Sequence, residues 1–479
     1  MISSHSGRAE RGTRPAVFLH VGAAKSGTTY LQQILWHNRH RLREHGVLYP
    51  GSDQAAHVRA AFDLRHTFFT GASDPSVPGA WRRLVDECRE WGGDAIISQE
   101  LFAPARMAYV RRALTDLNFA DVHVVFTVRD LARQIPAHWQ EDVKNRFDVS
   151  FSEFLATLKQ PDRKAFETAR LFWGLQDPVD VLRRWGGTLP RERVHVVTLP
   201  RPGAPRDLLW RRFCEAVRLD PDAYDLAAPF DNPSLGLAET QWLLRLNRAL
   251  DRERVGWHVH NAEVKLNLAQ GVLAARPSPS KTVLPAEHLP WATELAVDIV
   301  ERLRAARYDV VGDLYELIPM VGPGTAKWLP PAPDPDEPDW AAVADVGLDA
   351  VGTLLARLRA AEDRAARTAE PDVPVADRLT EMGGHAAQMR EVTGALAAEA
   401  VPPVVRAMRE VGDRYPAVRG QLRGAYRLLQ DIAARPDPDD STNPGKPPGK
   451  NANRNPNAGR NPNAGRTPNA GPNTDTNTR

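Results

Sequence analysis

The feature that most constrains this chain is a strand, a glycine loop and a helix that follow one another near the N-terminus. Residues 16–21, AVFLHV, form a short apolar run that predicts a buried strand. The stretch 20–32, HVGAAKSGTTYLQ, continues from it with Gly22 and Gly27 five positions apart, and apolar residues then recur at helical spacing. Phosphate-binding loops share this order. It predicts an α/β fold with an anion at the helix N-terminus.

The lysine of this loop stands in an unusual place. A Walker loop carries its lysine directly after the second glycine, but that position is Thr28, and the lysine comes earlier, as Lys25. Backbone N–H groups, the hydroxyls of Ser26, Thr28 and Thr29, and the Lys25 ammonium would converge on one phosphate group. The loop has no acidic residue that could hold Mg²⁺. The alternative is an ordinary glycine loop between a strand and a helix.

Apolar strands and amphipathic helices alternate along the rest of the first two thirds of the chain. Strands are expected within 94–100, 122–128 and 193–199, and a single helix is expected from the loop to a stop at Gly46. A further helix after residue 128 contains Pro136, near its first turns or at a kink. The segment from about 232 to 318 is expected to be mainly helical. This pattern predicts a parallel sheet flanked by helices on both faces.

Composition divides the chain into four parts. Residues 15–328 are expected to form one folded domain, and 329–339, LPPAPDPDEPD, a proline-rich linker. Residues 340–435 are expected to form a helical extension that serves packing or self-association. Residues 436–479, where NPNAGR occurs twice, are too polar to form a core and are expected to be a disordered tail.

The bulk properties exclude several classes of function. The net charge of +2 gives no general attraction to nucleic acid or to an anionic membrane. No apolar run is long enough to span a membrane, and the N-terminus has no signal-peptide core, so the expected location is cytoplasmic. The two cysteines, Cys88 and Cys214, lie in helical patterns and are expected to be buried thiols. No metal-ligand motif is present in the sequence.

The loop 20–32 resembles the 5′-phosphosulfate loop of sulfotransferases, which reads K-[ST]-G-T-T followed by an aromatic residue. The resemblance covers about residues 15–325. It implies a P-loop-like parallel sheet, 3′-phosphoadenosine 5′-phosphosulfate (PAPS) as co-substrate, and no metal. It also implies that Lys25 contacts the 5′-phosphate and the bridging oxygen. The residues that would hold the 5′-phosphate are Gly22, Ser26, Gly27, Thr28 and Thr29. Tyr30 would stack on adenine or serve as a core residue of the helix.

The resemblance extends less completely to the 3′-phosphate segment. That segment is a strand ending in arginine, which matches Arg129, and it has a serine eight residues later, where this chain has Ala137. Loss of one neutral hydroxyl should weaken donor binding without abolishing it. Arg133 or His138 would compensate. The late basic loop of the family has only a poor counterpart, at 276–281.

The resemblance also suggests where a general base would stand. Glu100 follows a predicted strand, where strand ends in open α/β sheets face the ligand crevice. It would accept the proton of an acceptor hydroxyl or amine, or else only stabilise the first turn of a helix. His20 and His138 are lesser candidates. The predicted function is PAPS-dependent sulfuryl transfer to a small-molecule or glycan acceptor, whose identity stays open. The alternatives are a catalytically silent binding protein with this fold and, less in keeping with Thr28, a P-loop small-molecule kinase.

Overall fold

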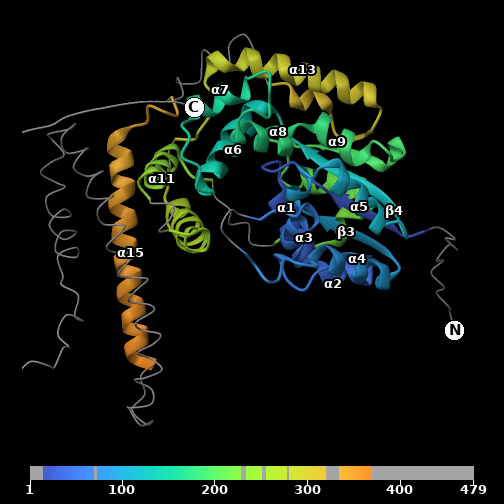
Figure 1. Cartoon of the computed structure of the whole chain (residues 1–479), viewed down its shortest axis with the longest axis horizontal. Helices are drawn as coiled ribbons and strands as arrows, with labels where there is room; N and C mark the ends of the chain where they lie inside the picture. Colours follow the sequence, from blue (N-terminus) through green and yellow to red (C-terminus); the bar gives the residue numbers. More distant parts are fainter. Residues whose placement is uncertain are drawn as a thin grey trace, which may run out of the picture. The chain divides into compact units, whose positions relative to one another are not determined.

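A six-stranded, all-parallel sheet forms the centre of the protein and carries helices on both faces (Figure 1). The computed structural model describes residues 14–68, 73–227, 234–250, 255–277, 280–319 and 334–368. The chain divides into two compact units, Met1–Ala433 and Ala434–Arg479, and the second lies outside the described residues. The predicted α/β class is confirmed.

The strand order places the first strand in the middle of the sheet. The strands are β1 (Ala16–His20), β2 (Val47–Leu48), β3 (Asp94–Ser98), β4 (Asp121–Val128), β5 (Val194–Thr198) and β6 (Asp309–Val311). Their order across the sheet is β2-β3-β1-β4-β5-β6. The chain therefore builds one side of the sheet with β2 and β3, then crosses β1 and builds the other side. The point where the direction reverses, at the carboxyl end of β1, is where open α/β sheets bind ligands.

Side chains of β1 alternate between two cores. Val17 and Leu19 join the larger core, while Ala16 and Phe18 point to a smaller core on the other face. Because both sets are fully apolar, the strand is buried on both sides, as the unbroken apolar run predicted.

Three helices cover the face of the smaller core: α1 (Thr28–His37), α2 (Arg39–Glu44) and α10 (Leu208–Val217). The prediction of one helix from the loop to Gly46 was wrong, because the helix breaks at Asn38. The Asn38 amide donates to the Ile34 carbonyl at 3.0 Å and to the Asp225 carbonyl at 2.8 Å. This side chain competes with the helical ladder and ends α1.

The larger core lies under a second set of helices. They are α3 (Ala56–Arg65), α4 (Ala80–Trp91), α5 (Met107–Asp116), α6 (Leu131–Lys144), α7 (Phe151–Leu158), α8 (Glu167–Gln176), α9 (Pro178–Gly186) and α13 (Leu289–Ala306). Pro136 lies inside α6, as predicted. Short 3₁₀ helices occur at Glu100–Phe102, Arg191–Arg193, Pro221–Ala223, Leu273–Ala275, Ala286–His288 and Leu314–Leu317.

The segment expected to be mainly helical contains one element of another kind. It forms α11 (Leu237–Ala249), α12 (Trp257–Val259), the π-helix η4 (His260–Gln270) and α13, but it also supplies β6, the last strand of the sheet. The predicted strands within 94–100, 122–128 and 193–199 are confirmed as β3, β4 and β5. Cys88 and Cys214 are buried free thiols, as expected.

The chain continues after a gap with α15 (Trp340–Thr368), which packs against α11. Residues 329–333 of the predicted linker lie outside the described residues, but 334–339 contact the folded body. Asp336 accepts hydrogen bonds from the backbone N–H groups of Phe151 and Ser152, at 2.9 and 2.8 Å, at the start of α7. The rest of the predicted helical extension and the predicted tail lie outside the described residues. Among the helices described, none is long and apolar enough to cross a membrane.

Candidate functional site

The glycine loop lies at the carboxyl end of β1 and extends its pairing with β4. The N–H of Ala23 donates to the Thr127 carbonyl at 2.7 Å, and the N–H of Thr127 donates to the Gly22 carbonyl at 2.6 Å. Helix α1 begins directly after the loop, and no side chain of the described residues caps its N-terminus. The N–H groups of its first turn have no intrahelical acceptor, so this end is suited to an anion.

Gly27 turns the loop into the helix with a backbone that other residues rarely adopt. Its φ angle is 84°, in the left-handed region. A Cβ atom at this position would lie 2.3 Å from Cδ2 of Leu209 and 3.3 Å from Cδ1 of Leu199. The backbone conformation therefore favours glycine here, and a side chain at this position would also displace Leu209.

Ser26 and Thr127 hold the shape of the loop from within. The buried Ser26 hydroxyl lies 2.5 Å from the Ala23 carbonyl and 2.5 Å from the Thr127 hydroxyl, and Thr127 donates to the Gly22 carbonyl at 2.9 Å. That Ser26 contacts a phosphate stays a prediction, and it requires the hydroxyl to leave one of these partners. Thr28 is also buried, whereas Thr29 is exposed at the start of α1.

His20 is a buried residue of the sheet. Its ring nitrogens lie 2.8 Å from the Ser98 hydroxyl and 3.3 Å from the Thr127 hydroxyl. Burial lowers its pKa to about 4, although a hydrogen bond with the backbone of Gly22 opposes the shift. The ring is neutral at pH 7 and has hydroxyl partners on both sides, which is a structural role.

Lys25 carries the charge of the loop away from the sheet and toward α6. Its φ angle is 63°, a left-handed conformation that is uncommon for a residue with a side chain. Its Nζ lies 2.5 Å from Oε2 of Glu141. Strained backbone of this kind is concentrated at functional sites.

Glu141 is the centre of a cluster of charged groups, defined here as the carboxyl-edge cluster: Lys25, Glu141, Lys144 and Lys265. Lys144 Nζ lies 3.1 Å from Oε2 of Glu141, and Lys265 Nζ lies 3.1 Å from Oε1. Burial alone would raise the pKa of Glu141, but the three ammonium groups outweigh it and hold the pKa well below its ordinary value. Glu141 is therefore an ionised, weak base.

Arg129, the residue expected to meet the 3′-phosphate, lies beside the loop. One of its terminal nitrogens donates to the Lys25 carbonyl at 3.1 Å, while its Nε is buried and has no partner among the described residues. Burial lowers its pKa to about 10, with the nearby Arg133 acting in the same direction. The guanidinium stays charged at pH 7, so a buried N–H donor of a half-buried cation, without a partner among the described residues, lies next to the phosphate loop.

Two further residues expected at the 3′-phosphate, Arg133 and Ala137, lie on α6. Arg133 forms an ion pair with Asp130, whose side chain caps the N-terminus of α6, and donates to the Pro200 carbonyl at 3.4 Å. Ala137 is half-buried. The basic loop at 276–281 lies partly outside the described residues, and its Arg276 is paired with Glu239 at 2.6 Å and with Asp349 at 2.7 Å.

Glu100 begins a short 3₁₀ helix directly after β3, so it shares the carboxyl edge of the sheet with the loop. Its Oε2 accepts a hydrogen bond from Gln32 of α1 at 3.0 Å. Tyr49 lies close enough that, after burial, the Glu100 carboxylate is the second cause of its raised pKa. The acidic partner of Lys25 in the structure is Glu141, and not Glu100.

Two further residues of interest pack within the protein. Tyr30 is half-buried against the smaller core, and its hydroxyl donates to the Arg206 carbonyl at 3.3 Å, so adenine stacking stays a prediction. His138 is buried beside Phe172 and accepts from Gln176 at 3.0 Å. Burial lowers the pKa of His138 to about 3, and the Lys25 ammonium adds to the shift.

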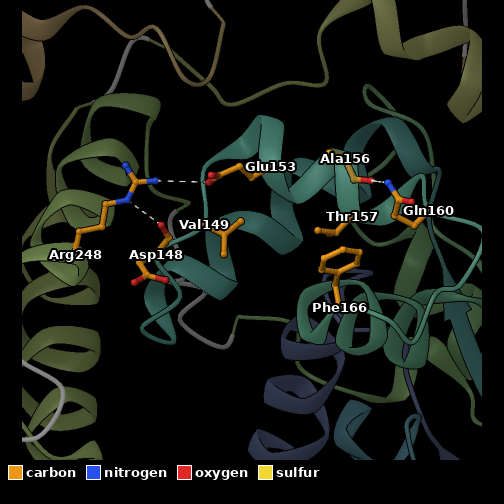
Figure 2. Close-up of a pocket in the computed structure, with 8 residues that line it drawn as sticks. All are labelled: Asp148, Val149, Glu153, Ala156, Thr157, Gln160, Phe166 and Arg248. Atoms are coloured by element: carbon orange, nitrogen blue, oxygen red, sulfur yellow. Dashed lines mark hydrogen bonds and ion pairs between the residues drawn. The ribbon is translucent and has the colours of Figure 1, made fainter. Parts of the chain in front are cut away.

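A separate hollow of about 780 Å³ opens beside α7 (Figure 2). Among its lining residues, Arg248 donates to the Asp148 carbonyl at 2.8 Å and lies 3.9 Å from Glu153 (Figure 2). The other lining residues are Val149, Ala156, Thr157, Gln160 and Phe166. None of the site residues expected from the sequence lines this hollow.

Sequence reasoning missed Glu141, Lys144 and Lys265. Glu141 and Lys144 stand one turn apart on the helix that follows Arg129, and this spacing could have indicated an ion pair close to the predicted donor site. Lys265 offered none, because it comes from a π-helix and reaches Asn145, 120 positions earlier, at 2.7 Å. Across the described ranges, no group of three or more His, Cys, Asp or Glu side chains could hold a metal ion.

The chain has little detectable similarity to known proteins. No protein-family model matches the chain, and no curated protein matches it. A solved structure that does match is a sulfotransferase from Alicyclobacillus acidocaldarius, with 20% sequence identity and a TM-score of 0.32. The match covers 54% of this chain and 96% of that chain. Any conclusion about function therefore rests on the residues of this chain.

Proposed function

We propose that this chain transfers a sulfuryl group from PAPS to a hydroxyl or amine acceptor without a metal. The observation that carries the proposal is the register of the loop: Lys25, held in a left-handed conformation, precedes Ser26 and Gly27 at an uncapped helix N-terminus. Lys25 lies before the second glycine, and its ammonium points toward α6, where it contacts Glu141. This arrangement suits a single 5′-phosphate with a sulfate neighbour and no Mg²⁺.

Two features of the described residues fit the two phosphate groups of PAPS. The first-turn N–H groups of α1, with Lys25 and Thr29, would hold the 5′-phosphate. Arg129, whose Nε is buried without a partner, would meet the 3′-phosphate. PAPS supplies the activated sulfuryl group when it is bound.

The residues of the chain would then divide the chemistry between them. Glu100 would take the proton of the acceptor hydroxyl as its oxygen forms the new bond to sulfur. Lys25 would neutralise the charge that develops on the phosphate oxygen as the bond from that oxygen to sulfur breaks. Glu141 is unsuited to the role of base, because its pKa is held low by three ammonium groups. Alignment of the groups would supply much of the rate.

Calorimetry on the purified full chain tests the proposal. Adenosine 3′,5′-bisphosphate and ATP with Mg²⁺ are titrated into the wild type, Lys25→Ala and Lys164→Ala, a matched control with an exposed lysine. We expect micromolar bisphosphate binding that Lys25→Ala weakens by about 30- to 150-fold, the loss of one charge-assisted contact of about 2–3 kcal/mol. The control should bind like the wild type.

Other outcomes would overturn the proposal in recognisable ways. Tighter binding of ATP with Mg²⁺ than of the bisphosphate would favour a P-loop small-molecule kinase instead. A second outcome is bisphosphate binding without transfer from PAPS to any member of a panel of phenols, amines and sugars. It would favour the alternative of a catalytically silent binding protein with this fold, in which Ala137 stands where the family has serine.

A further inference from the structure

The four side chains of the carboxyl-edge cluster carry a net positive charge. Three ammonium groups, from the loop, from α6 and from η4, surround the single carboxylate of Glu141 at 2.5, 3.1 and 3.1 Å. Two positive charges are therefore left without a partner within the cluster. The side chains are largely withdrawn from water, with exposed fractions of 26% for Lys25, 7% for Lys144, 19% for Lys265 and 24% for Glu141.

The neighbouring titratable groups do not offset this excess. Asp142 lies 3.5 Å from His138 Nε2, and burial, with the Glu141 charge, raises its pKa well above the ordinary value, which favours its uncharged form. His138 is neutral as well, because burial lowers its pKa to about 3. Asn145, which accepts from Lys265 at 2.7 Å and donates to Glu141 at 3.4 Å, carries no charge. Uncompensated cations in a partly desolvated place are costly unless an anion joins them.

Lys25 is the one cation of the cluster that the proposed function assigns to the donor. If Lys25 leaves Glu141 for the 5′-phosphate, Lys144 and Lys265 remain with a single carboxylate and one positive charge in excess. Lys265 contacts Oε1 of Glu141, whereas Lys25 contacts Oε2, so Lys265 lies on a different side of the carboxylate from the loop lysine. Its excess charge is thus available to a second ligand beside the donor.

We propose that Lys144 and Lys265, held together by Glu141, form an oxyanion subsite for the acceptor, which carries a carboxylate or sulfate group besides the nucleophile. This assignment of acceptor class rests on the proposed function. The anion would complete the charge balance of the cluster and fix the acceptor next to the loop, where orientation of the nucleophile matters most. Such a subsite selects acidic acceptors over neutral ones.

The test uses inorganic sulfate as the probe and the full chain saturated with adenosine 3′,5′-bisphosphate. Lys265→Met removes the charge at similar volume, Lys265→Arg keeps it, and Lys164→Met is the matched surface control. We expect Lys265→Met to weaken sulfate binding at least fivefold, with the other two variants within about twofold of the wild type, at low ionic strength where such contacts are strongest. Bisphosphate affinity should change less than twofold throughout.

A second arm separates acceptor from donor. Glucuronate and glucose differ by one carboxylate, so glucuronate should bind the loaded wild type more tightly, and the preference should disappear in Lys265→Met. Sulfate binding that is unchanged in Lys265→Met overturns the proposal. So does sulfate binding that depends on Lys25 alone, or a loss of bisphosphate affinity equal to that of sulfate, because either would assign the anion to the donor.

The outcome stays distinct from the fate of the proposed function. If the wild type does not bind bisphosphate, the donor assignment fails, yet sulfate can still be titrated into the unloaded protein. Lys265-dependent sulfate binding would then support the oxyanion subsite without the transferase, and its absence would remove both.

Discussion

Two polar clusters lie at opposite edges of the same sheet and are built on opposite principles. The amino-edge cluster consists of His123, His195, Asp309 and Arg218, and three of its members stand near the starts of the neighbouring strands β4, β5 and β6. His123 Nδ1 lies 2.9 Å from His195 Nε2, and His195 Nδ1 lies 2.6 Å from Asp309. The carboxyl-edge cluster joins a loop, a helix and a π-helix from distant parts of the chain.

The two clusters differ in whether all of their polar and charged groups have partners. Arg218 reaches His123 Nε2 at 3.5 Å, so one assignment of protons satisfies every ring nitrogen of the amino-edge cluster, with both imidazoles neutral. At the other edge, Lys25 has a strained backbone, two positive charges of the cluster lack partners within it, and Arg129 Nε has no partner among the described residues. A closed network stabilises a fold, whereas an open one is available to a ligand.

The largest expected effect breaks the loop itself. Gly27→Ala should destabilise the protein by about 2–3 kcal/mol, because the left-handed backbone is strained and the new Cβ would overlap Leu209. Gly203→Ala is the matched control: its φ is also positive, at 90°, but no atom of the described residues lies within 4 Å of the added Cβ. Urea unfolding measures both variants. Equal losses would mean that backbone conformation, and not the contact with Leu209, limits this turn.

A pH series tests the closed character of the amino-edge cluster. Burial, then Arg218 and His195, lower the pKa of His123 to about 3, so the unfolded chain binds a proton that the folded chain excludes. The contribution of the neutral His123 ring to the free energy of unfolding is therefore complete above pH 6.5 and is lost as the pH falls toward 3. His123→Gln should therefore reduce the loss of unfolding free energy between about pH 7.5 and 4.5 by about 2 kcal/mol.

The same pH series can contradict that interpretation. Urea midpoints at both pH values, compared with those of Lys164→Ala, supply the measurement. If the variant and the wild type lose stability in parallel, His123 is already protonated in the folded protein and the closed network is misassigned.

A smaller effect of opposite sign is expected at the carboxyl edge. Glu141→Gln removes the carboxylate that competes with phosphate for Lys25. Bisphosphate binding should tighten by about three- to tenfold, which corresponds to about 1 kcal/mol. Calorimetry against the wild type measures it. Weaker binding would instead show that Glu141 is needed to position Lys25.

The smallest effect concerns Ala137. Ala137→Ser restores the hydroxyl that the sulfotransferase pattern places eight residues after Arg129, and it should tighten bisphosphate binding by about 1 kcal/mol or less. An unchanged affinity in the same titration would mean that another group already serves the 3′-phosphate.

The sequence was sufficient wherever the information is contiguous. The apolar runs of β1, β3, β4 and β5 and the loop between Gly22 and Thr29 could be recognised directly. The two- and three-residue strands β2 and β6 are too short to leave an apolar run. The break at Asn38 depends on a bond to Asp225, far along the chain. The pairing of Lys25 with Glu141 spans 116 positions, so only the fold brings the two together.

The contacts of residues 334–368 decide where this protein can be shortened. Trp340 lies under Arg245 at 4.0 Å, Gly347 packs so closely on Trp242 that a Cβ would lie 2.7 Å from its ring nitrogen, and Asp336 holds the start of α7. Truncation at residue 328, directly before the proline-rich linker, would remove α15 from α11 and expose apolar surface to aggregation and proteolysis. A shortened version of the protein should therefore keep residues 334–368.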